Sequence, residues 1–267
     1  MAHTDEAEAH RLELLARAHD ALAPTYEETL AANPVAVWMR AQLWKHYARA
    51  FAPDGRLLDF AAGTGTDAVH LAQRGAKVVA IDVSPGMIAE LQRHAAEAGV
   101  HLDARVLSAE DLDQLEIEKV DGALTAFAGL NTIKDPARLS RNLAHLLNPH
   151  GRLVLHALNS FCFWEAINGL VHGQLPRPRQ HVTQIGGESV ALRFYDPFRL
   201  FHEAFARDFV LREAYALSVL VPPTWIRRAP RLAPLIFSLD RAAGRALPRA
   251  GDFFVMDLEK RAGQILS

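Results

Sequence analysis

The sequence predicts an α/β fold in which helices flank both faces of a mostly parallel, seven-stranded sheet. From Gly55 onward, short apolar segments typical of strands alternate with segments of helical periodicity, a pattern typical of a doubly wound sheet. A glycine-rich turn follows the first of these strands, as at the ligand edge of such sheets. After Asn159 the alternation stops, and two more strand-like segments follow near the end of the chain. We therefore expect an antiparallel C-terminal strand and an inserted helical and aromatic cap.

The composition is that of a folded domain. Of the 267 residues, 50% are hydrophobic and 22% are charged, which is enough apolar surface for a full core. The net charge of −2 argues against nucleic acid as a partner. The single cysteine, Cys162, excludes an internal disulfide and a cysteine-based zinc site, so we expect a cytoplasmic setting. No apolar run is long enough for a membrane span, and no histidine pair has metal-ligand spacing beside acids, so we expect neither an integral membrane segment nor a metal.

Residues 1–50 are interpreted as an N-terminal helical arm. Residues 1–33 are polar and of helical character, and Asn33-Pro34 is typical of a helix start, with proline in the first turn. Trp38 and Leu43 follow at roughly helical spacing. We expect this arm to close over the ligand edge of the sheet.

Residues 51–159 are expected to form the ligand-binding core. Ser84 and Asp135 each precede a proline, which predicts a capped helix start at both positions. The expected strands are Arg56–Phe60, Lys77–Asp82, Leu102–Leu107, Gly122–Phe127 and Arg152–Leu158, and the expected helices are Thr66–Arg74, Pro85–Ala98 and Pro136–Leu147.

The remainder is divided into a cap and a sheet-completing segment. Residues 160–208 are interpreted as the substrate cap, with a helix over Pro197–Arg207. Residues 209–267 are expected to complete the sheet with strands at Phe209–Val221 and Phe253–Leu258 and helices between them. These helices carry apolar residues beside several arginines, which favours a half-buried helix with a basic outer face. The alternative is peripheral association with a membrane surface.

The strongest motif is the run from Leu57 to Ala68, Leu-Leu-Asp-Phe-Ala-Ala-Gly-Thr-Gly-Thr-Asp-Ala. Its glycines allow a tight turn and a close approach of the backbone to a ligand, and the following helix start offers free N–H groups. The spacing also satisfies the relaxed dinucleotide fingerprint, which is weak alone. Asp59 argues against a dinucleotide, because a carboxylate in this strand suits a cationic amino group. Asp82, at the end of the second strand, suits a ribose in either class.

At these positions the chain resembles the class I S-adenosylmethionine-dependent methyltransferases, over roughly residues 20–160. The resemblance implies their Rossmann-like fold and transfer of a methyl group from S-adenosylmethionine to a small molecule. Five segments carry it in the family's order: Asp59–Gly65, Val78–Asp82 with Ser84–Met87, Ser108–Leu112, Asp121–Asn131 and Leu146–Val154. The departures are Ala61-Ala62 at the start of the turn, Ser108 where an aspartate is frequent, and His150 in place of a glycine.

The resemblance also implies a cofactor site closed by the arm. Gly63 and Gly65 would give access to the methionine part, Asp59 would orient its amino group, and Asp82 would hold the ribose. Arg40 suits the carboxylate of the cofactor. The full set implied is Tyr26, Arg40, Asp59, Ala61, Gly63, Thr64, Gly65, Asp82, Val83, Met87, Ser108, Ala109, Glu110 and Phe127.

The reaction expected is direct in-line transfer to an apolar or aromatic acceptor, leaving S-adenosylhomocysteine. Asn131 and His156 are candidate catalytic residues, since they follow or close strands near the ligand edge, although a structural role is an alternative for both. Candidate acceptor-binding residues in the cap are Phe161, Trp164, Glu165 and Tyr195. The alternatives are an NAD(P)-dependent oxidoreductase and a non-catalytic cofactor-binding module. The chain is expected to act as a monomer or homodimer.

Overall fold

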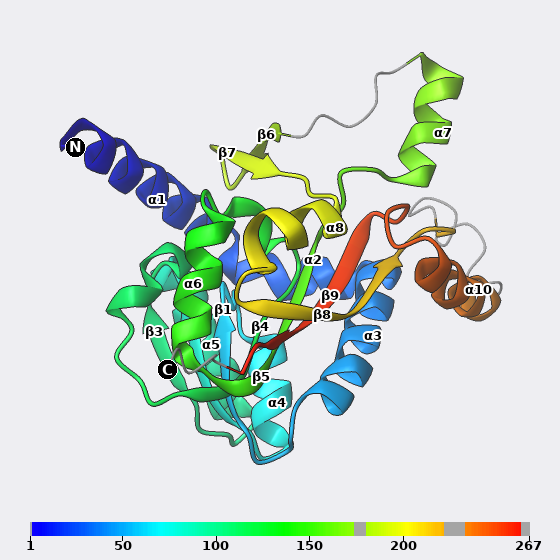
Figure 1. Cartoon of the computed structure of the whole chain (residues 1–267). Helices are drawn as coiled ribbons and strands as arrows, with labels where there is room; N and C mark the ends of the chain where they lie inside the picture. Colours follow the sequence, from blue (N-terminus) through cyan, green and yellow to red (C-terminus); the bar gives the residue numbers. More distant parts are fainter. Residues whose placement is uncertain (1, 174–179, 222–232, 263–267) are drawn as a thin grey trace.

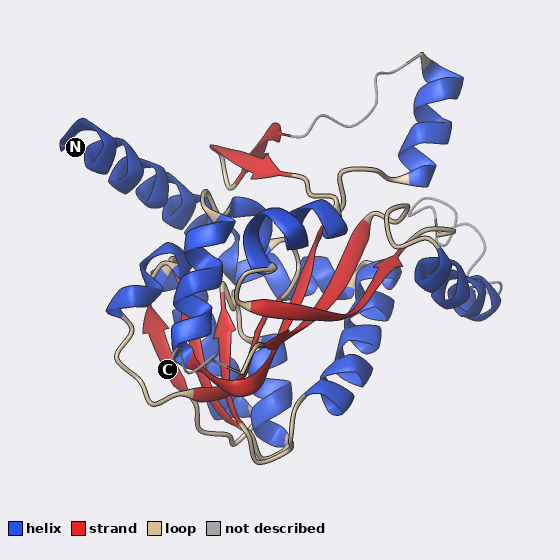
Figure 2. Ribbon diagram, in the orientation of Figure 1, coloured by secondary structure: helices blue, strands red, loops and turns tan. Residues whose placement is uncertain are grey.

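The computed structural model describes residues 2–173, 180–221 and 233–262 (Figure 1). A seven-stranded sheet in the order β3-β2-β1-β4-β5-β9-β8 forms its centre, with helices on both faces (Figure 2). Strands β1 to β5 are parallel to one another, and β9 runs antiparallel to both β5 and β8. The predicted doubly wound sheet and its antiparallel C-terminal strand are thus confirmed.

The N-terminal segment is helical throughout its described part. It comprises α1 (Ala2–Leu22), η1 (Ala23–Thr25), α2 (Tyr26–Ala31) and α3 (Pro34–Ala50). Helix α3 begins where the sequence predicts, because the side-chain oxygen of Asn33 accepts the N–H groups of Val35 and Ala36. Ser84 and Asp135 cap the helices after β2 and β4 in the same way.

The core follows the predicted alternation closely. Its elements are β1 (Arg56–Phe60), α4 (Thr66–Gln73), β2 (Lys77–Asp82), α5 (Pro85–Glu97), β3 (Asp103–Val106), η2 (Ala109–Gln114), β4 (Val120–Thr125), η3 (Gly129–Thr132), α6 (Pro136–Leu146) and β5 (Leu147–Leu158). The end of β4 differs from the prediction, and this difference affects the site. Strand β4 ends at Thr125, because Phe127 and Ala128 adopt left-handed backbone conformations with φ of 48° and 73°. These two residues therefore leave the sheet at its ligand edge.

The two faces of the sheet bury separate apolar layers. Leu57 and Val78 point toward α3, α4 and α5, whereas Leu58 and Val79 point toward η2 and α6. This alternation follows from the two-residue period of a strand. Both faces of the central strands are covered, so the ligand edge at their carboxyl ends is the open side of the core.

The cap contains an unexpected β-hairpin beside the predicted helical elements. Helix α7 (Phe163–His172) is followed by β6 (Gln180–Ile185) and β7 (Glu188–Arg193), and then by α8 (Pro197–Leu200) and a single π-helical turn, η4 (Phe201–Phe205). Gly186 and Gly187 join the two strands with φ of 56° and 86°. A Gly-Gly pair between two segments of alternating apolar and polar residues is a local signal for a hairpin.

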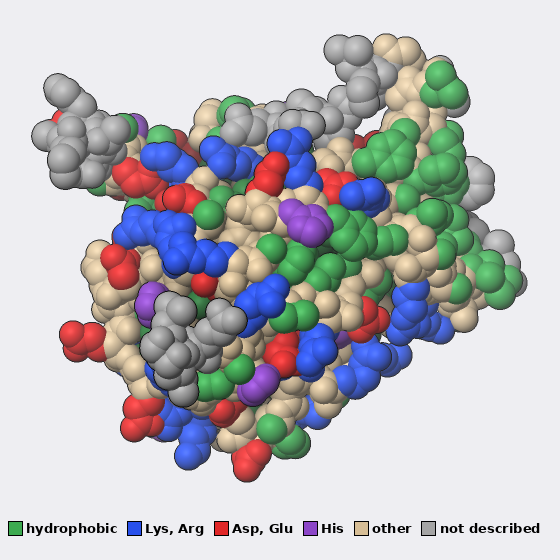
Figure 3. Space-filling model, viewed as in Figure 1, with side chains coloured by type: hydrophobic (Ala, Val, Ile, Leu, Met, Phe, Trp, Pro, Cys, Tyr) green, Lys and Arg blue, Asp and Glu red, His purple; other side chains and the backbone are tan. Residues whose placement is uncertain are grey.

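The C-terminal segment supplies β8 (Phe209–Leu217), α10 (Ala233–Ala246) and β9 (Phe253–Lys260). Hydrophobic side chains gather on the side of the molecule from which α7 and α10 project (Figure 3). Leu170 on α7 and Leu235 on α10 are largely exposed. Part of the segment predicted to form helices with a basic outer face lies outside the described residues, namely Trp225, Ile226, Arg227, Arg228 and Arg231. No helix within the described ranges has the length and hydropathy needed to cross a bilayer.

Candidate functional site

The turn after β1 uses its two glycines for different purposes. Gly63 has a φ of 55°, and a Cβ there would meet only the ring of Tyr26, at 3.9 Å. Gly65, with a φ of 78°, begins α4, and a Cβ there would collide with the side chain of Leu91 on α5. Gly63 therefore leaves space for a ligand, whereas Gly65 allows α4 to pack against α5.

A cavity of about 310 Å³ opens beside this turn, at the carboxyl ends of β1, β2 and β4. Its volume is at the lower end of the range of small-molecule sites. Every residue of the predicted cofactor set except Gly65 lines this cavity. The lining also includes residues outside the predicted set, namely Leu12, Leu15, His19, Leu22, Glu27, Ala62, Thr66, Asp67, Ala126, Ala128, Gly129, Thr132, Ile133, Gln184, Ile185, Gly186 and Leu192.

Asp82 joins the first two strand ends. Its Oδ2 accepts the N–H of Gly63 and its Oδ1 accepts the N–H of Ser84, both at 2.9 Å. Burial raises the pKa of this carboxyl, and these two backbone bonds oppose the rise. A carboxylate oxygen has room for more than one donor, so Asp82 can still accept a pair of hydroxyl groups from the cavity.

A buried acid, Asp59, and a partly buried cation, Arg40, also line the cavity. Oδ2 of Asp59 has no hydrogen-bond partner among the described residues, and burial, with Asp67 and Asp82 nearby, raises the pKa of Asp59 well above its usual value. Arg40 opposes that rise. The Arg40 guanidinium lies 4.7 Å from the centroid of the Phe127 ring and is only loosely paired with Glu27, at 3.9 Å. Such a pair can receive a ligand group that carries both charges.

Helix α2 brings two side chains over the glycine turn. The Tyr26 ring lies against Gly63, and burial raises the pKa of its hydroxyl to about 12, so it remains a neutral donor. Glu27 accepts the hydroxyl of Thr64 at 2.5 Å. Tyr26 belongs to the predicted cofactor set and Glu27 does not, since nothing in a short polar helix shows which of two adjacent residues faces the core.

Helix α1 and the β6–β7 hairpin form an apolar wall opposite the turn. Leu12, Leu15 and Leu22 come from one face of α1, and Ile185 and Leu192 come from the hairpin. The hairpin turn is in contact with the helix, because a Cβ on Gly186 would collide with the carbonyl of Ala18. The leucine spacing was an available signal for this wall, but the charged residues around it led to the interpretation as a polar arm.

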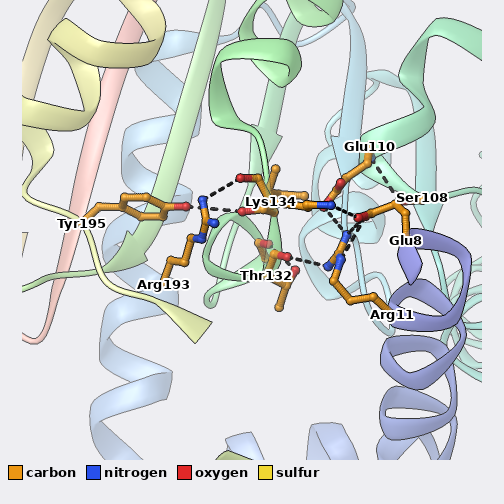
Figure 4. Close-up of polar contacts among 10 residues, drawn as sticks. Glu8, Arg11, Ser108, Glu110, Thr132, Lys134, Arg193 and Tyr195 are labelled. Atoms are coloured by element: carbon orange, nitrogen blue, oxygen red, sulfur yellow. Dashed lines mark hydrogen bonds and ion pairs between the residues drawn. The ribbon is translucent and has the colours of Figure 1, made fainter. Parts of the chain in front are cut away.

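Polar contacts fasten this wall to the core (Figure 4). Arg11 of α1 binds Glu110 at 2.5 Å and the carbonyl of Thr132 at 3.1 Å. From the opposite side, Arg193 of β7 donates to the carbonyl of Lys134 at 2.6 Å. Further along α1, Asp20 accepts the hydroxyl of Ser84 at 2.5 Å and the N–H of Gly86 at 2.7 Å.

The two candidate catalytic residues lie behind the cavity rather than in its lining. Asn131 is fully buried, and its amide bonds the backbone of Leu158 and Arg193. His156 is also fully buried, and its Nδ1 accepts the N–H of Phe127 at 3.1 Å. Burial, assisted by Arg40, lowers the pKa of His156 to about 3, so its imidazole is neutral at ordinary pH.

The four candidate acceptor-binding residues also lie outside the cavity lining. Phe161 and Glu165 are exposed at the base of α7, with Trp164 half-buried between them. The hydroxyl of Tyr195 donates to the carbonyl of Ile133 at 3.4 Å, and burial raises its pKa to about 12. The aromatic residues of the cap are therefore not the wall that faces the glycine turn; the hairpin takes that place.

Residues 57–151 match the family model described as a methyltransferase domain. The ubiquinone biosynthesis O-methyltransferase of Xanthomonas axonopodis pv. citri (strain 306) is 38% identical over 104 residues, which are 39% of this chain and 43% of that protein. Its counterpart in Xanthomonas campestris pv. campestris (strain B100) is 38% identical over 112 residues, covering 42% of this chain and 46% of the relative. The match thus spans less than half the length of these curated relatives.

Solved structures share the fold at low identity. The CcbJ methyltransferase from Streptomyces caelestis superposes with a TM-score of 0.62 at 17% identity and covers 92% of this chain and 99% of its own. The DhpI–SAH complex superposes with a TM-score of 0.58 at 18% identity and covers 95% of this chain and 98% of its own. The cyclase SpnF superposes with a TM-score of 0.63 at 18% identity and covers 93% of this chain and 96% of its own. A cyclase among them shows that this fold does not by itself fix the reaction.

The motifs, the strand order and the family match agree on the same segment. The glycine turn, Asp59 and Asp82 all lie within it, and the sheet that carries them has the topology of the solved relatives. Residues 57–151 of this chain match the methyltransferase-domain family, and the chain shares the fold of solved methyltransferases.

Proposed function

We propose that this chain binds S-adenosylmethionine and directs its methyl group onto a small apolar or aromatic acceptor. One observation carries the proposal: a single cavity holds a carboxylate suited to a ribose, Asp82, together with an acid and a cation suited to an amino acid, Asp59 and Arg40. The solved neighbour named a DhpI–SAH complex supports the choice of ligand.

The residues present fit this cofactor. The partnerless Oδ2 of Asp59 would receive the ammonium group, and Arg40 would receive the carboxylate. Asp82 would accept the ribose hydroxyls, with Met87, Ser108 and Ala109 around the base. Bound S-adenosylmethionine supplies a methyl group already activated on a sulfonium, so the protein has to orient two reactants and exclude water. Such positioning contributes roughly 7–11 kcal/mol.

The charges around the turn disfavour a dinucleotide. Asp59, Asp67 and Asp82 all line the cavity, so a pyrophosphate would meet acidic side chains there. Nothing in the site favours an NAD(P)-dependent oxidoreductase over the methyltransferase.

The chemistry of the wall supports an apolar acceptor. Leu12, Leu15, Ile133, Ile185 and Leu192 face the cavity, and Gln184 and Thr132 are among the few polar groups on that side. The curated relatives are named as O-methyltransferases of ubiquinone biosynthesis, which supports an aromatic acceptor with a hydroxyl group. We infer that the acceptor meets the cofactor below α1 and the hairpin, in a cytoplasmic setting, with the chain acting as a monomer or homodimer.

Calorimetric titration of the purified chain tests the proposal. We expect micromolar binding of S-adenosylmethionine and S-adenosylhomocysteine and no comparable binding of NADH. Binding only in the millimolar range would contradict the cofactor assignment. Incubation with S-adenosylmethionine and a panel of phenols, followed by mass spectrometry, tests the reaction. Tight binding without methylated product from any phenol, thiol or amine would support a non-catalytic module instead.

A further inference from the structure

The loop after β4 is held in a strained conformation where it lines the cavity. Phe127 and Ala128 are consecutive non-glycine residues with φ of 48° and 73°. Left-handed backbone is unfavourable for residues that carry a Cβ, and it persists only where surrounding contacts determine it. Such outliers cluster at functional sites, and here both residues line the cavity.

His156 supplies the contact that determines this conformation. Its Nδ1 accepts the N–H of Phe127 at 3.1 Å, and its ring meets the Phe127 ring edge-on with centroids 5.1 Å apart. The imidazole is itself fixed from behind, because it stacks on Phe253 of β9 at 4.6 Å. His156 and Val255 are register partners, so the sheet sets the position of the imidazole.

The protonation state of His156 suits a permanent acceptor. Nδ1 takes the amide proton of Phe127, so the proton of the neutral ring lies on Nε2. Burial, assisted by the charge of Arg40, lowers the pKa of His156 to about 3, and the ring does not become charged at ordinary pH. Its lone pair at Nδ1 is engaged with the backbone and is therefore not available as a base for an acceptor.

The conformation of Phe127 matters because its ring supports Arg40. The guanidinium carbon lies 4.7 Å from the ring centroid, in the geometry of a cation–π contact. The only ion pair of Arg40 within the described part of the chain is the loose one with Glu27, at 3.9 Å. The ring of Phe127 is thus the firm support of a cation that the proposed function assigns to the cofactor carboxylate.

We propose that His156 is a positioning residue for the carboxylate end of the cofactor. By accepting the N–H of Phe127 it fixes the left-handed turn, the turn places the aromatic ring under Arg40, and the ring holds the guanidinium toward the cavity. This inference rests on the proposed function, since it assigns Arg40 to the same cofactor. It replaces the catalytic role considered for His156.

The test compares two nucleosides that differ in the group Arg40 would bind. S-adenosylhomocysteine carries the carboxylate, whereas 5′-methylthioadenosine has the same nucleoside and sulfur without the amino-acid end. In His156→Leu the acceptor at Nδ1 is lost. We expect the Kd for S-adenosylhomocysteine to rise about five- to tenfold, the scale of one cation–π contact, and the Kd for 5′-methylthioadenosine to stay within about twofold. His156→Asn, whose Oδ1 can accept the same N–H, should recover much of the lost affinity.

A matched control separates positioning from loss of stability. Asp240 is also buried and also accepts the N–H of a left-handed residue, Ser218, at 3.0 Å, but it lies on α10 outside the cavity lining. Asp240→Leu should lower the melting temperature and leave the ratio of the two Kd values unchanged. Calorimetry below the melting temperature of every variant keeps the comparison among folded proteins.

Different outcomes would overturn the positioning role of His156 and the proposed binding of S-adenosylmethionine. A wild-type protein that binds neither nucleoside would overturn the proposed function. A wild-type protein that binds both, with His156→Leu weakening the two equally or neither, would overturn the positioning role alone. Failure of His156→Asn to restore selectivity would also contradict it.

Discussion

At the scale of single residues, Asp82 accepts two backbone N–H groups and, in the proposed function, would also accept the ribose hydroxyls. Asp82→Asn retains the shape and one acceptor oxygen but loses the charge. We expect cofactor binding to weaken by about 1–3 kcal/mol, the scale of hydrogen bonds to a charged group, as measured by calorimetry. Asp135→Asn is the control, because Asp135 caps α6 on the surface. Unchanged affinity in Asp82→Asn would remove the ribose assignment.

Asp59 leads to a pH prediction whose sign follows from its environment. Burial raises the pKa of Asp59 above its usual 3.8, so the folded state binds its proton more tightly than the unfolded chain. Its contribution to stability therefore falls as pH rises from about 4 through the raised value. Asp59→Asn should then melt at a higher temperature than the wild type near neutral pH, with the gain vanishing toward pH 4.

The same substitution should act in the opposite direction on binding. Asp59→Asn lacks the carboxylate for the ammonium group, so calorimetry should show weaker binding of S-adenosylhomocysteine. In the wild type, affinity should decrease as pH falls through the raised pKa. Greater stability together with unchanged affinity would show that Asp59 is a structural acid and not part of the cofactor site.

At the scale of elements, α1 is positioned by contacts that the sequence alone could not reveal. Arg11 binds Glu110 and the carbonyl of Thr132 across long separations along the chain. Breaking this fastening with Arg11→Gln should weaken cofactor binding severalfold, mainly by faster dissociation in stopped-flow measurements. The stability change should stay below about 1 kcal/mol, because the pair is partly exposed. Arg93→Gln removes comparable ion pairs on the surface of α5 and should change neither quantity.

The elements differ in how well local sequence determines them. β1 and β2 have the predicted bounds, because an apolar run ends at Asp59-Phe60 in one case and at Asp82 in the other. Strand β4 is shorter than predicted, since the turn at Phe127 depends on His156, a residue of another strand. The hairpin had a local signal in Gly186-Gly187, which was masked by its position in an aromatic, proline-containing insertion.

At the scale of the whole molecule, the strand order and the glycine-turn side of the cavity are predictable from sequence, whereas the docking of α1 against the hairpin is not. Five different motifs follow one another in a fixed order along the core and indicate which strand ends meet. The wall depends on α1 and the hairpin docking on each other through Ala18 and Gly186, and such tertiary contacts leave no periodic pattern. Because the outer face of α1 is charged, the overall composition of this helix is polar even though one of its faces is apolar.

A ligand in this cavity should therefore stabilise three separate segments at once. The cavity is lined by the turn after β1, by α1 and α2, and by the hairpin, and these come from distant parts of the chain. Saturation with S-adenosylhomocysteine at a hundred times its Kd should stabilise the fold by about 2.7 kcal/mol, measurable as a rise in melting temperature. Hydrogen exchange followed by mass spectrometry should show slower exchange in residues 8–31 and 181–193 as well as in the turn. The amides of β8 are a control, because that strand is at the far edge of the sheet and already paired. If protection were confined to residues 61–65, α1 and the hairpin would not close on the cofactor, and the acceptor would have to approach from another side.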